Sequence, residues 1–337
     1  MQAYLPSIWF LLWGLLWAIY FALDGFDLGA GMLAAWLPKR ERETAVRSLG
    51  PVWDGNEVWL ITAGGVTFAA FPKLYATMFS SLYAPLMLVL VALILRAVAI
   101  EFSHLVESEV WKGFWINVLS VASLLVALLL GVAFGNIFQG LPFDQAGYHG
   151  TLLTLLNPYG LLTGVLFVVA FLYNGSAWLA RAEDRALRER GMRLSAGLWP
   201  VFLALAALFM GATPFATELF ANYLRQPLLL LLPLLAVAAL VGARLFMARR
   251  QAGLTLIAGS GAVLLTVMAA VVGLYPNMFP SSLDPAMTLT AFNAASSLGT
   301  LRLMLIVTII FLPIVLLYQI WFYKLFNGPE TDEEALY

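Results

Sequence analysis

Long apolar stretches with very little charge constrain this chain more than any other feature of its sequence. Of its 337 residues, 62% are hydrophobic and only 11% are charged, whereas soluble domains have about 25% charged residues. Apolar runs of roughly 20 residues can cross a bilayer as helices, and they are far longer than the alternating strands of a membrane β-barrel. The sequence therefore predicts an all-α integral membrane protein that crosses the bilayer several times.

Nine apolar segments follow one another, and we interpret residues 1–337 as one polytopic membrane domain. The first segment has no basic residue before Lys39 and is too long for a cleavable signal sequence, so we expect it to be a retained span. The nine transmembrane helices are expected near residues 7–36, 51–71, 75–101, 113–138, 157–180, 194–217, 227–247, 254–275 and 300–326.

Basic residues are distributed unevenly between alternate connections, and this predicts the orientation of the chain. One side has fourteen lysines and arginines, whereas the other has only Lys73 and Arg225. Cytoplasmic connections are the ones enriched in lysine and arginine, so we expect the N-terminus outside and the C-terminus in the cytoplasm. The fourteen are Lys39, Arg40, Arg42, Arg47, Lys112, Arg181, Arg185, Arg188, Arg190, Arg193, Arg244, Arg249, Arg250 and Lys324.

Three longer connections differ in character. Residues 139–156 and 276–299 contain prolines and few charges, which is typical of loops that fold back onto helix ends as short caps. The Arg-rich stretch 181–193 is expected to be either a helical extension or a solvated cytoplasmic loop.

Charged residues inside three consecutive predicted spans are the main candidates for function. A charged group within a span is costly unless it is paired or hydrated, so its presence usually has a functional reason. The predicted orientation places all of them in the cytoplasmic half of the membrane. They are Asp24 and Asp27 in the first span, Asp54 and Glu57 in the second, and Arg96 and Glu101 in the third.

The spacing of these residues predicts that they face other helices. Asp24 with Asp27, and Asp54 with Glu57, are i,i+3 pairs, so each pair lies on one helix face. Glycines at positions 25, 29 and 31 surround the first pair and permit close helix approach. Arg96 is the natural counter-ion for one carboxylate, since its forked guanidinium suits bidentate pairing.

Two interpretations of these charges remain open. In the first, the carboxylates pass protons, and Asp54 is the best candidate because Gly55 and Asn56 beside it favour a hydrated, irregular helix start. In the second, Asp24, Asp27 and Arg96 form a static ion pair that fixes helix packing. Glu57 and Glu101 would then be hydrated groups at the interface. The proton-pathway hypothesis comprises Asp54, Glu57, Asp24, Asp27 and Glu101, with Arg96 as the ion-pairing residue.

Several functional classes are disfavoured by composition. The net charge of −1 gives no electrostatic basis for a nucleic-acid partner. The chain has no cysteine, which removes disulfides and thiolate ligands. Its two histidines, His104 and His149, are expected on opposite sides of the membrane, so they cannot ligate one haem together, and no metal site is expected.

Several motifs along the chain resemble subunit II of the cytochrome bd quinol oxidases. The resemblance covers nearly the whole sequence in the family's order, and the first two motifs are the most specific. These motifs are Leu23-Asp24-Gly25-Phe26-Asp27-Leu28-Gly29, Trp53-Asp54-Gly55-Asn56-Glu57-Val58-Trp59-Leu60, Arg96-Ala97-Val98-Ala99, Gly131-Val132-Ala133-Phe134-Gly135-Asn136, Asn157-Pro158-Tyr159-Gly160 and Pro276-Asn277-Met278-Phe279-Pro280-Ser281-Ser282.

This resemblance implies the smaller subunit of a terminal oxidase that reduces O2 to water with electrons from quinol. It implies two four-helix bundles plus one peripheral helix, in the bacterial cytoplasmic (inner) membrane. The partner would be subunit I, which carries haem b and haem d, and a small single-helix accessory subunit occurs in such complexes. Some members also hold a structural quinone in subunit II. Asp54 matches the aspartate that the family assigns to proton entry from the cytoplasm.

An alternative class is a proton- or Na+-coupled secondary transporter, in which intramembrane carboxylates couple ion movement to a substrate. Transporter sites tend to lie near the bilayer midplane at broken helices of two repeats, whereas the charges here are confined to three consecutive spans. A self-contained haem b protein is disfavoured by the two histidines. The sequence therefore favours the oxidase subunit over both alternatives.

Overall fold

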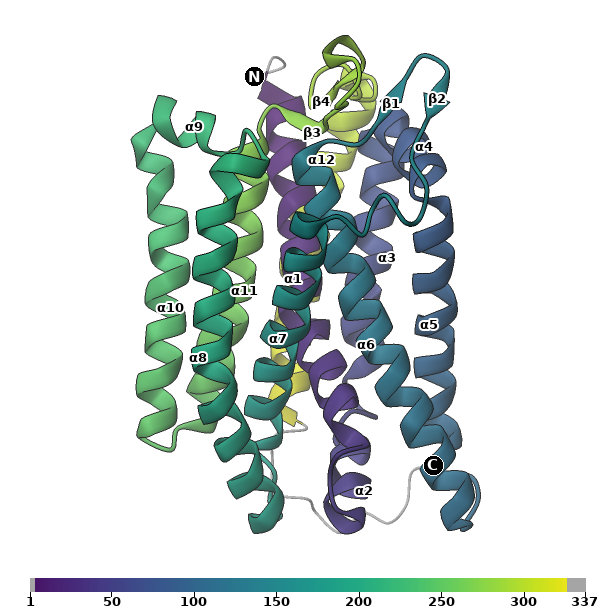
Figure 1. Cartoon of the computed structure of the whole chain (residues 1–337), viewed down its shortest axis with the longest axis vertical. Helices are drawn as coiled ribbons and strands as arrows, with labels where there is room; N and C mark the ends of the chain where they lie inside the picture. Colours follow the sequence, from purple (N-terminus) through teal and green to yellow (C-terminus); the bar gives the residue numbers. More distant parts are fainter. Residues whose placement is uncertain (1–3, 326–337) are drawn as a thin grey trace.

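The computed structural model describes residues 4–325, in which long helices run side by side between two ends of the molecule (Figure 1). Eight of these helices are long and apolar enough to cross a membrane. The α-helices are α1 (Leu5–Ala34), α2 (Lys39–Arg47), α3 (Trp53–Ala70), α4 (Pro72–Ser81), α5 (Tyr83–Phe102), α6 (Glu109–Gln139), α7 (Pro158–Leu179), α8 (Arg185–Ala216), α9 (Phe220–Arg225), α10 (Leu231–Ala248), α11 (Ala252–Leu274) and α12 (Leu298–Leu325).

The segment predicted as one span near 75–101 is the clearest error of the sequence prediction. The structure divides it into the short helix α4 and the longer helix α5, with a break at Leu82 (φ −103°, ψ 23°). Pro85 lies in the first turn of α5, where the missing N–H of proline costs little. The sequence from residue 83 onward therefore begins a new helix, and only α5 is among the eight apolar helices.

The two Pro-rich connections meet at one end of the molecule, which we call the loop end and which also holds α4 and α9 (Figure 1). The first connection forms a hairpin of β1 (Phe143–Asp144) and β2 (Gly147–Tyr148), and the second pairs β3 (Asn277–Phe279) with β4 (Leu289–Thr290). An isolated bridge between Leu141 and Ser281 joins them. These connections fold over helix ends as expected, and their short strands were not predicted.

The opposite end, which we call the basic end, holds α2 and the connections 103–108, 180–184 and 249–251 (Figure 1). Ion pairs tie α2 to its neighbours there. Glu41 accepts bonds of 2.5 and 3.1 Å from Arg190 of α8, and Lys39 lies 2.9 Å from Glu109 at the start of α6. The Arg-rich stretch is a helical extension, since α8 already begins at Arg185.

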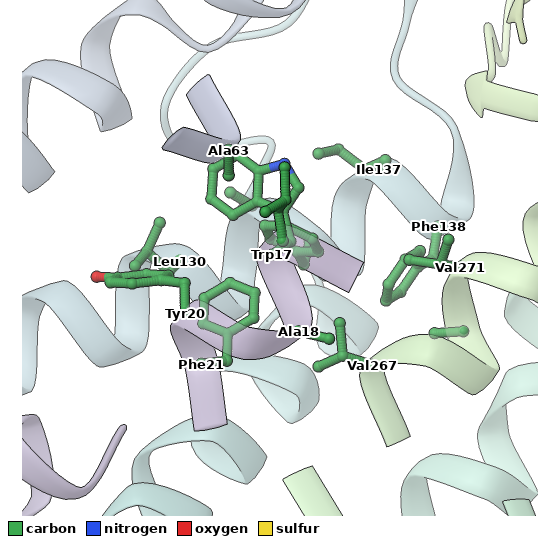
Figure 2. Close-up of a cluster of buried hydrophobic side chains, with 14 of the residues drawn as sticks. Trp17, Ala18, Tyr20, Phe21, Ala63, Leu130, Ile137, Phe138, Val267 and Val271 are labelled. Atoms are coloured by element: carbon green, nitrogen blue, oxygen red, sulfur yellow. The ribbon is translucent and has the colours of Figure 1, made fainter. Parts of the chain in front are cut away.

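Helix α1 is the centre of the packing, and it contacts α3, α6, α7 and α11. Figure 2 shows Trp17 and Phe21 of α1 among Leu130 and Ile137 of α6 and Val271 of α11. Helix α12 packs mainly along α1 and α3, and its Phe322 and Tyr323 also pack in a cluster with Ala177 of α7 and Leu256 of α11. The remaining long helices form two groups around α1, namely α3, α5 and α6 on one side and α7, α8, α10 and α11 on the other.

Candidate functional site

The charged residues of the first and third predicted spans form a buried ion pair. Arg96 of α5 donates two hydrogen bonds to Asp24 of α1, with lengths of 3.0 Å to Oδ2 and 2.6 Å to Oδ1. Both side chains are 0% exposed. This bidentate arrangement is the strong form of a guanidinium–carboxylate interaction, and it confirms the expected pairing of Arg96.

Asp27, one turn further along α1, completes a cluster with more acidic than basic groups. Its Oδ2 atom lies 3.9 Å from Nη2 of Arg96 and accepts a 2.7 Å hydrogen bond from the side-chain amide of Asn56 on α3. Its Oδ1 atom has no hydrogen-bond partner among residues 4–325. One oxygen of this buried carboxylate is therefore available to a proton or a water molecule.

Asn56 extends the cluster to α12, far away in the sequence. Its Oδ1 atom accepts hydrogen bonds from Tyr323 (2.6 Å) and from Gln319 (3.2 Å). The Oε1 atom of Gln319 in turn accepts a 2.8 Å bond from Trp59. Asp27 can only accept when ionised, so the amide nitrogen of Asn56 must face Asp27 and its oxygen must face α12. A continuous hydrogen-bonded line therefore connects α1, α3 and α12.

A groove of about 530 Å³ runs between α1, α3 and α12 and reaches this line. Asn56, Gln319 and Tyr323 line it together with Asp54, and most of the other lining residues are apolar. Asp54 is exposed, and within the described part of the chain it forms no ion pair or side-chain hydrogen bond. It is therefore an exposed carboxylate beside a buried polar cluster.

The predicted irregular start of α3 is not observed. The helix is continuous from Trp53, and Asn56 is fully buried. Glu57 is half-buried and interacts electrostatically with Arg96, Asp24 and Asp54. Asp54 and Glu57 therefore lie on the part of α3 next to the cluster, but Asp54 is exposed and does not face another helix as expected, whereas Glu57 is half-buried.

Glu101 lies apart from the other five charged residues. It is exposed near the end of α5, five residues after Arg96, which corresponds to about 7.5 Å along a helix. It interacts electrostatically with His104 of the following connection. The structure thus brings together Asp24, Asp27 and Arg96 with Glu57 and Asp54 beside them, and it leaves Glu101 at the basic end.

Gln319 and Tyr323 are the members of this site that sequence reasoning missed. They are four residues apart and so lie on one face of α12, in a helix that is otherwise almost entirely apolar. Polar side chains at helical spacing in such a segment were a usable signal. Asn56 was noted only as a neighbour of Asp54, and the structure makes it the connection between α1 and α12.

The two histidines lie at opposite ends of the molecule, as expected. His104 is at the basic end, and His149 follows β2 at the loop end, where it forms a 2.8 Å contact with Asp144. Within residues 4–325, no three His, Cys, Asp or Glu side chains are arranged to hold a metal ion.

The surroundings of His104 predict a pH dependence of stability. Partial burial, together with nearby Arg47 and Lys112, lowers the pKa of His104 below its usual value, although Glu101 and Glu43 oppose the shift. The unfolded chain then binds a proton more readily than the folded chain, so stability should fall as pH drops from about 7 towards 5. We expect thermal unfolding in detergent to show this slope, and His104→Gln to reduce it. An unchanged slope in the variant would assign the pH dependence to other groups.

Comparisons with known proteins agree over nearly the whole chain. Residues 5–326 match the family model for cytochrome bd terminal oxidase subunit II. A probable cytochrome oxidase subunit 2 of Haemophilus influenzae is 34% identical, with 99% of each chain covered. The cytochrome bd ubiquinol oxidase subunit 2 of Bacillus subtilis is 33% identical, again with 99% of each chain covered. The cytochrome bd-I ubiquinol oxidase subunit 2 of Escherichia coli K12 is 32% identical over 98% of this chain and 96% of its own.

The fold is also shared with a solved structure. A chain in the structure of the bd oxidase from Geobacillus thermodenitrificans superposes with a TM-score of 0.78, covering 96% of this chain and 99% of that one. The sequence identity is 19%, so this comparison supports the arrangement of the helices rather than the role of any residue.

Proposed function

The chain belongs to the family of subunit II of the cytochrome bd terminal oxidases, and we propose that its groove beside Asp54 admits protons to the oxidase. It is therefore one subunit of a quinol-oxidising, haem-containing complex of the bacterial inner membrane, and subunit I is its partner. The observation that carries the proposal is the exposed carboxylate of Asp54 in a groove lined by Asn56, which is hydrogen-bonded to buried Asp27.

We assign haem b and haem d to subunit I rather than to this chain. The only two histidines follow α5 and β2, at opposite ends of the described helices, so their geometry does not fit joint ligation of one iron. No step of the proposed pathway passes through a haem in this subunit. Its residues instead hold and pass protons towards the partner, where O2 is reduced.

We further propose that α3 is a ninth membrane crossing and that the basic end faces the cytoplasm. α1 ends at the basic end and α5 begins at the loop end (Figure 1), so the chain must return along α3. The polar residues that open α3 explain why its mean hydropathy falls short of the other eight. Cytoplasmic connections of membrane proteins are generally enriched in lysine and arginine, so the concentration of these residues at the basic end supports this orientation. Membership of the family supports two four-helix bundles with α12 as the peripheral helix.

Within the cluster, Arg96 is proposed to hold Asp24 in place while Asp27 exchanges the proton. Asp24 uses both carboxylate oxygens to bind Arg96, whereas Asp27 has a free Oδ1 atom among the described residues. The buried Nε atom of Arg96 also lacks a partner in that part of the chain. Buried polar atoms are normally satisfied by protein or by ordered water, so water is expected to connect these groups.

Asp54→Asn tests the entry point. The amide keeps the size of the side chain but cannot release a proton, so we expect quinol-dependent O2 consumption to slow at least tenfold, in line with general acid–base contributions. The haem spectrum and the yield of assembled oxidase should be unchanged, because Asp54 is exposed and unpaired among residues 4–325. Oxygen-electrode rates and visible spectra of the purified complex measure both.

Glu107→Gln provides the matched control, since Glu107 is an exposed carboxylate at the basic end outside the groove. Its turnover should equal that of the parent. Normal turnover in Asp54→Asn would rule out Asp54 as the entry group, and loss of assembly would indicate a structural role instead.

A further inference from the structure

A second polar cavity lies at the basic end, away from the groove beside Asp54. It has a volume of about 570 Å³ and is enclosed by the end of α7, the first turns of α8 and the turn between α10 and α11. Four arginines line it, and Glu189 is its one acidic lining residue. The four are Arg181, Arg185, Arg188 and Arg250.

The side chains that line this cavity carry more positive than negative charge. Glu189 pairs with Arg185 at 3.1 Å, and Arg188 donates a hydrogen bond to the backbone carbonyl of Glu183 and interacts electrostatically with Asp184. Asp184, which begins α8, caps the helix by accepting from Leu187 and lies 3.7 Å from Arg40 of α2. One carboxylate therefore faces four guanidinium groups within the cavity, which leaves an excess of positive charge.

The backbone conformation of Arg250 is a second indication that the positive charge of the cavity serves to bind a ligand. Arg250 has a positive φ of 57° at the end of α10, where the amide of Gln251 bonds back to Phe246. Glycine is the usual residue at such a helix end, because other L-residues cost about 1–2 kcal/mol in this conformation. An arginine at this position lines the cavity despite that cost.

The charges at the start of α8 also indicate an anion-binding site. This helix has no acidic residue in its first turn, although helix N-termini favour negative charge. Arg185 and Arg188 are therefore placed where positive charge is unfavourable for the helix. An anion in the cavity would relieve their repulsion with the helix terminus and with each other.

The cavity adjoins an exposed apolar surface of α11. Gly253 lines the cavity, and an added Cβ there would meet no atom within 4 Å. The next residues of α11 include Leu254 and Ile257, which are 43% and 68% exposed. Both belong to one of the apolar helices long enough to cross the membrane. A charged cavity thus adjoins an open apolar helix surface at the level where a bilayer has its headgroups.

We propose that this cavity binds the phosphate headgroup of an anionic phospholipid, whose acyl chains lie against α11. Forked guanidinium groups bind phosphate oxygens in pairs, and basic pockets between transmembrane helices suit anionic lipid headgroups. A soluble phosphate would use only the arginines, whereas a phospholipid also uses the exposed face beside Leu254 and Ile257. The site depends on its position at the membrane surface and not on the proton pathway.

The test uses the whole oxidase complex, purified in detergent and stripped of bound lipid. Dioleoylphosphatidylglycerol, dioleoylphosphatidylcholine and inorganic phosphate are added separately, and bound lipid is counted by native mass spectrometry. We expect phosphatidylglycerol to remain bound and to raise the unfolding temperature, whereas phosphatidylcholine should do neither. Equal retention of the two lipids would overturn the proposal. Equal stabilisation by free phosphate would replace the lipid with a soluble anion.

Two double variants locate the site. Arg188→Gln with Arg250→Gln removes two charges from the cavity, and phosphatidylglycerol should bind on the order of 30-fold more weakly. Arg193→Gln with Arg249→Gln removes the same charge from neighbouring exposed positions that do not line the cavity, and binding should change little. An equal loss in both variants would show attraction by overall charge and would overturn the cavity as the site.

Discussion

Replacing Arg96 with leucine is expected to prevent most of the chain from assembling into a haem-containing complex. The change leaves Asp24 and Asp27 buried without their counter-ion, and Asp24 loses both hydrogen bonds from the guanidinium group. Breaking a buried ion pair in this way costs about 3–5 kcal/mol, which is a large fraction of the stability of a typical domain. The yield of complex extracted in mild detergent and its unfolding temperature measure the effect.

Arg96→Lys and a double variant distinguish the contributions to this loss. Lysine keeps the charge but cannot form the bidentate contact, so we expect an intermediate yield. Asp24→Leu combined with Arg96→Leu replaces both partners by apolar groups, which is often close to neutral, so it should assemble better than either single variant. Single variants with parental stability would show that the pair contributes nothing.

The double variant also separates the two roles that the sequence left open. A purely structural ion pair predicts that restored assembly brings restored O2 consumption. A pair that positions Asp27 for proton transfer predicts that assembly returns without turnover. Comparing yield with turnover per haem therefore decides between packing and conduction.

The buried charges could be predicted from sequence because the membrane leaves few alternatives for them. An arginine in the middle of an apolar segment needs an acidic partner, and the first predicted span offered Asp24 and Asp27 at the same depth as Arg96 in the third. The same physical constraint made the helical character and the sidedness of the basic residues predictable. Most observed helices therefore overlie the expected apolar segments.

The features of the structure that could not be predicted depend on changes in helix direction and on contacts between residues far apart in the sequence. The hydrophobicity of a sequence segment indicates how much apolar surface it has but does not indicate a bend. The break at Leu82 therefore could not be recognised within the segment near 75–101. The bonds from Asn56 to Gln319 and Tyr323 join residues more than 260 positions apart. The spacing of Gln319 and Tyr323 marks one face of α12, but no local pattern specifies that this face meets α3, because that choice is made by the packing of the whole bundle.

Gly29→Ala is expected to cause a loss comparable to that of Arg96→Leu, through packing rather than charge. A Cβ at position 29 would lie 1.8 Å from the backbone oxygen of Phe171 and 2.9 Å from the backbone nitrogen of Gly175 on α7. Backbone atoms cannot rotate away, so α1 and α7 would have to separate. Overpacking of this kind costs about 1–3 kcal/mol and sometimes more, and the unfolding temperature of the complex should fall accordingly.

Gly261→Ala is the matched control for this change. It is also a glycine within an apolar helix, α11, but an added Cβ would meet no atom within 4 Å, and alanine is the better helix former by about 1 kcal/mol. The control should be neutral or slightly stabilising, and similar losses in both variants would contradict the close contact between α1 and α7. Gly29 is two residues after Asp27 on α1, so separation of the helices should also displace the buried carboxylate from Asn56. Gly29→Ala should therefore lower turnover in whatever fraction still assembles, whereas Gly261→Ala should leave it unchanged.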